Sequence, residues 1–200
     1  MSSTRSSARL IRLLSSVALL ALGTTVLTSC DDHPGPAKAQ AREARGTALD
    51  GGMQSEAEIS FEHAQVGAEY WVSLPQTGNR SAKPLTLLDA EITQVPAGVK
   101  VLEYKAVSGN DTEGHAMGVS LTGADAGEIE RARDRAGRPV RVKAHRVSDV
   151  YYLARVRVTG TVHGNLDDCR FRYRQGSTEY SQDLPCLTRI RLGAPLKLRD

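Results

Sequence analysis

Five histidines and three cysteines have the most versatile chemistry in this chain, because they can act as metal ligands, nucleophiles or bases. The nearest approach to a metal-site spacing is His115-Ala116-Met117, whose imidazole and thioether suit copper. A complete site of this kind needs a further methionine, and residues 91–100 contain none. We therefore predict that His115 lies in a loop, that Met117 packs in the core and that no cofactor is required. A copper-handling site at these two residues is the alternative.

Sequence motifs of the common enzyme classes are incomplete. Residues 118–123 miss the Gly-x-Ser-x-Gly elbow of hydrolases by one position. The chain also has no His-Glu-x-x-His zinc motif, no phosphate loop and no dinucleotide fingerprint. We predict that the protein is not an enzyme, although groups distant in sequence can still meet in space.

The N-terminal segment has the pattern of an export signal. Residues 13–26 are apolar after a start that holds three arginines, and they are too short for a comfortable membrane span. Leu27-Thr28-Ser29-Cys30 follow and resemble the bacterial lipobox. The resemblance implies a signal peptide over residues 1–29, cleavage before Cys30, a diacylglycerol group on its thiol and a further acyl chain such as palmitate on the new amino terminus. Asp31 is then a sorting signal only if the cell has an outer membrane.

We therefore expect a lipid anchor on the extracytoplasmic face of the cell membrane. Two or more acyl chains hold a protein firmly, whereas a single chain gives only marginal binding. An ordinary cleaved signal peptide and an uncleaved anchor are the alternatives.

The other two cysteines, Cys169 and Cys186, are an even pair in an oxidising compartment, which predicts a disulfide bond. A tight turn at Gly176-Ser177 would place Cys169 opposite Leu184, so Cys186 would be diagonal to its partner, and a bend at Pro185 would close the gap. A redox-active pair favours Cys-x-x-Cys spacing, which is absent.

The elements that position these residues fall into two parts. Residues 30–55 are rich in Ala, Gly, Pro and charge, which predicts a flexible tether because little apolar surface is available to bury. Residues 56–200 show short runs of period two, such as Tyr70-Trp71-Val72-Ser73-Leu74, separated by turn signals such as Gly109-Asn110-Asp111. We predict a mainly β fold, an antiparallel β-sandwich of 8–10 short strands.

One short helix is expected at residues 125–137. Asp125 is a candidate cap, Ile129 and Ala132 recur at helical spacing, and Gly137 with Pro139 ends the segment. The arginines of this segment are Arg131, Arg133, Arg135 and Arg138, and its acids are Asp125, Glu128, Glu130 and Asp134. Equal numbers predict a solvated, salt-bridged surface.

Several segments of the domain resemble uncharacterised secreted lipoproteins of actinobacteria. They are Tyr70-Trp71-Val72-Ser73-Leu74, Lys83-Pro84-Leu85-Thr86-Leu87-Leu88-Asp89-Ala90 and Val95-Pro96-Ala97-Gly98-Val99. The resemblance implies an immunoglobulin-like sandwich without an assigned activity. Trp71 precedes both Cys169 and Cys186, which departs from the Cys, Trp, Cys order of immunoglobulin domains.

Seven arginines alternate with apolar residues along three predicted strands, so each set lies on the polar face of its strand. They are Arg155, Arg157, Arg170, Arg172, Arg174, Arg189 and Arg191. If these strands share a sheet, the arginines form one basic face that can contact anionic lipid, wall polymer or an envelope protein. The alternative is that acids such as Glu58, Glu62, Glu103 and Glu179 lie across from them.

The overall charge excludes one class of partner. The leader holds three arginines and no acid, so the remaining chain has 23 basic and 23 acidic residues. A neutral chain with one Trp and two Phe lacks the basicity and aromatic content of a nucleic-acid binder. We predict a non-enzymatic binding or accessory module at the cell surface.

Overall fold

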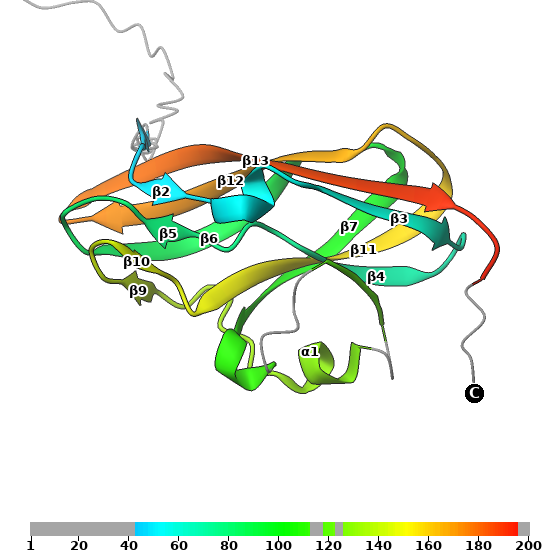
Figure 1. The fold of residues 1–200 in the computed structure, drawn as a ribbon, viewed down its shortest axis with the longest axis horizontal. Coiled ribbons are helices and arrows are strands. Elements are labelled where there is room, and N and C mark those ends of the chain that lie inside the picture. The colour runs from blue at the N-terminus through cyan, green and yellow to red at the C-terminus, as the bar shows by residue number, and fades with distance from the viewer. Residues whose placement is uncertain (1–42, 113–117, 123–125, 196–200) are drawn as a thin grey trace, which may run out of the picture. The chain divides into compact units, whose positions relative to one another are not determined.

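A computed structural model describes residues 43–112, 118–122 and 126–195. These residues form thirteen strands, two 3-10 helices, Gly52–Ser55 (η1) and Gly109–Asp111 (η2), and one α-helix, Gly127–Arg131 (α1) (Figure 1). The prediction of a mainly β sandwich with one short helix is confirmed, although the described residues hold thirteen strands rather than the 8–10 expected. The immunoglobulin-like assignment stays a prediction.

The first sheet has the strand order β1-β13-β12-β6-β9, and β3 also pairs with β13. Its strands are Ala44–Arg45 (β1), Glu58–Ala64 (β3), Leu85–Gln94 (β6), Val140–Val142 (β9), Leu166–Gln175 (β12) and Thr178–Leu192 (β13). The pairs of β13 with β1 and with β3 are parallel, whereas the other pairs are antiparallel. The sheet is therefore mixed rather than wholly antiparallel as predicted.

The second sheet is antiparallel and has the order β7-β11-β4-β8. Its strands are Glu69–Ser73 (β4), Ala97–Ser108 (β7), Val119–Leu121 (β8) and Val150–His163 (β11). A third, small sheet joins Leu49–Asp50 (β2), Gly78–Asn79 (β5) and Arg146–Val147 (β10). The chain changes between the two larger sheets several times, among them between β6 and β7 and between β11 and β12.

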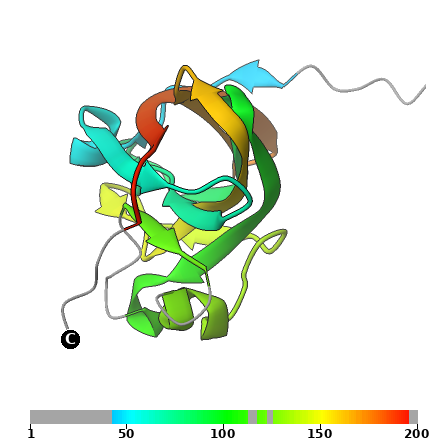
Figure 2. The same cartoon turned by 90° about the vertical axis from the view of Figure 1, so that its right-hand side faces the viewer.

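The main core lies between the two larger sheets, and Figure 2 shows the strands arranged around it. Phe171 and Tyr173 on β12 belong to this core, together with Tyr70 on β4 and Tyr152 on β11. The rings of Tyr152 and Phe171 meet edge to face, with centroids 6.1 Å apart. Alternation along β12 buries these rings and leaves Arg172 and Arg174 exposed, as the period of two predicts.

A smaller core covers the other face of the second sheet. Trp71 and Leu153 from that sheet pack there with Ile129 of α1. The Trp71 indole N–H donates to Oε1 of Glu130 at 3.0 Å, which satisfies its polar atom. Trp71 is 2% exposed, so its ring is fully buried against α1. The α1 segment is thus fixed to the sheet rather than projecting into solvent.

The predicted tether over residues 30–55 is wrong for residues 43–55, which belong to the folded domain. Leu49 on β2 is 1% exposed and is part of the main core. Its backbone N–H donates to Oε1 of Gln182, and its carbonyl accepts from Nε2 of the same side chain, both at 2.9 Å. A partner 133 residues away therefore holds a segment that has little apolar surface of its own.

The disulfide between Cys169 and Cys186 is present, with the two Cα atoms 5.7 Å apart. The predicted register is confirmed, since Tyr173 lies opposite Tyr180 and Cys169 opposite Leu184. A register shift between Asp167 and Cys169 leaves Pro185 and Cys186 opposite the single residue Asp168, whose φ is 52°. This β-bulge, rather than a bend at Pro185 alone, brings Cys186 to its partner.

Strands β11 and β13 are longer than the short runs expected. β13 continues through Pro185 over fifteen residues. On its outer side, β1 pairs with residues 180–181 and β3 with residues 187–192, so Pro185 falls between these two neighbours. A proline is tolerated in a strand at a position of this kind, where no N–H is needed. No helix among the described residues is long and apolar enough to cross a membrane.

Candidate functional site: an arginine pocket

The predicted basic face is wrong in its geometry, because its arginines lie on two sheets. Arg155 and Arg157 belong to β11 in the second sheet, whereas the other five arginines belong to β12 and β13 in the first. Strands β11 and β12 are consecutive, but the chain changes sheets at Gly164-Asn165. A single face across residues 155–191 therefore does not form.

Acidic side chains neutralise six of these seven arginines. The pairs join Arg155 to Glu69 and Glu103, Arg157 to Glu69, Arg170 to Asp183, Arg172 to Asp89 and Glu43, Arg174 to Glu179, and Arg189 to Glu58. The seventh, Arg191, donates to Oδ1 of Asn165 and to the carbonyl of Gly164. The alternative reading, acids across from the arginines, is thus what the structure has, although Glu62 accepts from Ser60 Oγ instead.

The ion pairs also lower the pKa values of two of the acids, Asp183 and Glu69. The hydrogen bond from Arg170 lowers the pKa of Asp183 below its usual value. The hydrogen bond from Arg157 is the main cause that lowers the pKa of Glu69, and Arg155 adds to it. The positive charge of the arginines on these outer faces is therefore largely compensated by acidic side chains of the same chain.

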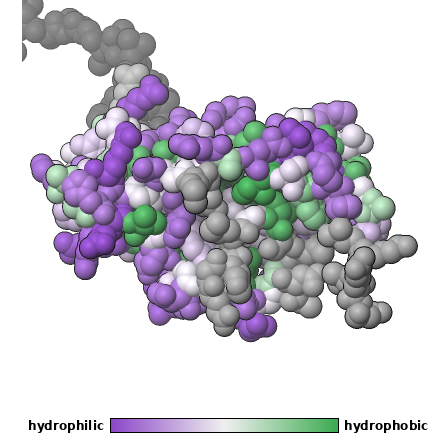
Figure 3. All heavy atoms as spheres, viewed as in Figure 1, coloured by the Kyte–Doolittle hydropathy of each residue, from purple (hydrophilic) through white to green (hydrophobic). Residues whose placement is uncertain are grey.

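Apolar surface does not mark a site either. Figure 3 shows hydrophilic residues over much of the face that it draws, with hydrophobic residues in smaller groups. The exposed large hydrophobic residues of the described chain, Val66, Val95, Val147 and Leu192, come from four separate segments.

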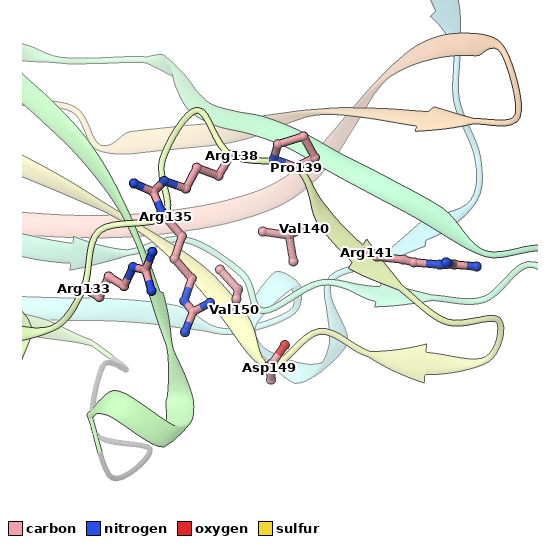
Figure 4. Close-up of a pocket in the computed structure, with 8 residues that line it drawn as sticks. All are labelled: Arg133, Arg135, Arg138, Pro139, Val140, Arg141, Asp149 and Val150. Atoms are coloured by element: carbon pink, nitrogen blue, oxygen red, sulfur yellow. The ribbon is translucent and has the colours of Figure 1, made fainter.

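One cavity of about 330 Å³ is lined mainly by arginines (Figure 4). We call it the arginine pocket, and its lining residues are Arg133, Arg135, Arg138, Pro139, Val140, Arg141, Asp149 and Val150. Four arginines against one aspartate give the lining a formal charge of +3. Val140 and Val150 are buried, so the wall of the pocket joins the sandwich core.

The loop between α1 and β9 supplies most of these arginines, and hydrogen bonds fix its path. Arg135 N–H donates to the carbonyl of Ala106 on β7 at 2.8 Å, and Ala106 N–H donates to Oδ1 of Asp134 at 3.1 Å. The loop thus covers the free edge of β7. Ala136 N–H also donates to Oδ1 of Asp134, which is an Asx turn.

A tight turn then aims the last arginine of this loop. Arg138 N–H donates to the carbonyl of Arg135 at 3.0 Å, and Gly137 has a φ of 71°. A positive φ at the third position of a four-residue turn is typical of type II and favours glycine. Arg135 and Arg138 are therefore held at the two ends of one defined turn.

The loop arginines lack the acidic partners that the sequence suggests. The side chains of Arg133, Arg138 and Arg141 make no ion pair or hydrogen bond within the part of the chain that the structure describes. Arg135 makes one long contact, 3.5 Å from its Nη2 to Oδ2 of Asp111, and its buried Nε has no partner among the described residues.

The expected balance of this segment is therefore wrong for two of its four acids. Glu130 accepts from the Trp71 indole, and Asp134 accepts from the backbone N–H groups of Ala106 and Ala136. Asp125 lies outside the described residues. The acids that are close in sequence thus serve the packing of the loop, and their arginine neighbours keep free donors.

Figure 4 shows how the arginines differ in direction. Arg133, Arg135 and Arg138 come from the loop on one side of the pocket, whereas Arg141 on β9 extends away from them. The three loop arginines therefore form one side of the pocket, and Arg141 lies at its far side.

A second cavity, of about 470 Å³, lies between the segment that joins β1 to β2 and the hairpin of β12 and β13. Arg80 Nε at its wall donates to the carbonyl of Thr47. The hydroxyl of Tyr173 accepts from the N–H groups of Thr47 and Ala48, both at 3.1 Å. These polar groups hold the N-terminal segment in place, so the cavity is better explained by folding than by binding.

The other predicted site residues are not placed. Cys30, His115 and Met117 lie outside the described residues. Among residues 43–112, 118–122 and 126–195, no group of three or more His, Cys, Asp or Glu side chains is arranged to hold a metal ion.

The arginine pocket was not predicted, because the acids near these arginines in the sequence were expected to be their partners. The usable signal was the cluster of Arg133, Arg135 and Arg138 beside the turn residues Gly137 and Pro139. No protein-family model, no curated protein and no solved structure matches this chain.

Proposed function

We propose that this chain is a lipid-anchored protein of the extracytoplasmic face of the cell membrane, and that its β-sandwich is a binding module without enzymatic activity. The anchor is supported by Leu27-Thr28-Ser29-Cys30 directly after the apolar residues 13–26. The disulfide between Cys169 and Cys186 supports export, because such bonds persist in oxidising compartments.

The arginine pocket is the observation that carries the binding role. Its three loop arginines have donors to spare, and hydrogen bonds to β7 fix the loop before any ligand arrives. A preformed site loses less conformational entropy when it binds. Charge held in this way suits recognition of an anion.

The lining of the pocket favours binding over catalysis. Asp149 is the only acid in it, and the lining contains no Ser, Cys, His or Lys. Acid–base or nucleophilic catalysis needs a second group within hydrogen-bond reach of the first. Arginine stays protonated and does not supply that group.

Acylation at Cys30 is tested by intact-mass analysis of the protein from the membrane fraction of its native host. We expect cleavage before Cys30 and the added mass of two or three acyl chains. A Cys30→Ala variant should lose the anchor, whereas Ser29→Ala keeps a small residue at that position and should still be processed. A soluble, unacylated product of the unaltered chain would overturn the anchor.

A further inference from the structure

We propose that the arginine pocket binds a phosphate group in its dianionic form, as free phosphate or as the terminal phosphomonoester of a lipid headgroup. This inference rests on the proposed binding role and names its ligand class. The anchor at Cys30 is tested by mass, so failure of phosphate binding and failure of the anchor are distinguishable.

The charge of the pocket favours a dianion. The lining carries a formal charge of +3, and without Arg141, which extends away, the three loop arginines against the single acid, Asp149, give +2. A phosphomonoester carries about −1.5 to −2 at pH 7, whereas a carboxylate carries −1. The dianion therefore gains more from the pocket and leaves less of its charge uncompensated.

The donors of the pocket also suit a tetrahedral oxyanion. A guanidinium presents a planar fork of N–H groups that matches two phosphate oxygens at once. Arg133, Arg135 and Arg138 supply three guanidinium groups from one loop. A phosphate with three terminal oxygens can engage several forks, whereas a carboxylate has only two oxygens.

The rest of the chain shows why this site is distinct. Six of the seven arginines on β11, β12 and β13 are already paired with acids, and Arg191 donates to Asn165 and to the Gly164 carbonyl, so they offer little to an external anion. These ion pairs lie on the outer faces of the strands, where an added anion must compete with a carboxylate that is already bound to the arginine. In the arginine pocket neither Arg133 nor Arg138 forms an ion pair with a carboxylate within the described chain, and Asp149 is the one acid of the lining.

The test is isothermal titration of the full chain, purified from membranes in a non-ionic detergent, with inorganic phosphate at low ionic strength. We expect saturable binding that weakens as sodium chloride is raised from about 0.1 M to 1 M, because the Debye length falls from ~10 Å to ~3 Å. Dihexanoyl phosphatidic acid, a soluble lipid with a phosphomonoester head, serves as the second probe. Dihexanoyl phosphatidylcholine, whose phosphate is a diester masked by a cation, is its control.

Matched variants assign the binding to the pocket. The double variant Arg133→Gln with Arg138→Gln should weaken phosphate binding by at least about tenfold, since each removes a charge-assisted hydrogen bond. The control Arg146→Gln with Arg174→Gln removes the same charge from exposed positions outside the pocket and should change binding less than about twofold. Arg133→Lys with Arg138→Lys keeps the charge but not the forks, and should fall between the two.

Each outcome has a definite meaning. Tighter binding of phosphatidic acid than of inorganic phosphate assigns the lipid source, and equal binding assigns free phosphate. Absence of saturable binding by both probes overturns the proposal, as does an equal loss in the pocket and control variants. Thermal melts check that all variants are folded. We expect them to be, because the substituted side chains are exposed.

Discussion

Replacing Leu49 with alanine tests whether the N-terminal segment belongs to the folded domain. Leu49 is 1% exposed within the main core, and truncation of a buried leucine costs between about 2 and 5 kcal/mol. Both backbone groups of Leu49 are tied to Gln182, so β2 is restrained from collapsing into the space left by the lost side chain. We therefore expect a loss of ~3 kcal/mol or more in the free energy of unfolding. That loss corresponds to a fall of roughly 10 °C in Tm for a domain of this size.

The assay is urea denaturation of Leu49→Ala and of a control, Val147→Ala, at a position 65% exposed. The control should change the free energy of unfolding by less than about 0.5 kcal/mol, as exposed substitutions usually do. Hydrogen exchange gives a second readout, because the Leu49 amide donates to a buried acceptor and should be strongly protected.

If residues 43–55 were a tether, Leu49→Ala would behave like its control and the Leu49 amide would exchange freely. That pair of results would refute the inclusion of β2 in the domain. A large loss of stability together with free exchange of the Leu49 amide would contradict only the hydrogen bonds to Gln182, and not the burial of the Leu49 side chain.

Burial raises the pKa of Tyr152, and the charge of Asp89 makes a smaller contribution. The neutral Tyr152 side chain therefore contributes fully to the free energy of unfolding below about pH 10, the pKa of an unfolded tyrosine, and this contribution is lost as the pH rises above that value. Tyr152→Phe should flatten this alkaline loss in urea midpoints measured at several pH values, and an unchanged slope would contradict the reasoning. Gly137→Ala should cost about 1–2 kcal/mol in urea denaturation from its positive φ alone, because an added Cβ meets no atom within 4 Å. Replacing Cys169 and Cys186 together by serine should cost about 3 kcal/mol by the same assay, and an unchanged midpoint would mean that the bond contributes nothing.

Local rules predicted the hairpin of β12 and β13 well. The alternation of Cys169, Phe171 and Tyr173 with polar residues fixes which face is buried. The short turn at Gly176-Ser177 then fixes the register, and hence the approach of the two cysteines. Both signals come from residues that are close in sequence.

The features that escaped prediction depend on partners far along the chain. Leu49 is held by Gln182, and Glu130 is taken by Trp71, 59 residues away. Neither contact can be predicted by counting the charges in residues 125–137. The sequence therefore predicted the layers of the fold but not which charges remain free.

The central claim is that the three arginines of the α1–β9 loop are a preformed receptor for phosphate. The most direct measurement is a phosphate titration followed by two-dimensional NMR of the arginine Nε–Hε groups, with each signal assigned by substitution. We predict saturable shifts for Arg133, Arg135 and Arg138, with the unpartnered Nε of Arg135 among the largest, while the signals of Arg172 and Arg174 stay fixed in their ion pairs. Small, uniform, non-saturating shifts across all arginines would contradict the claim.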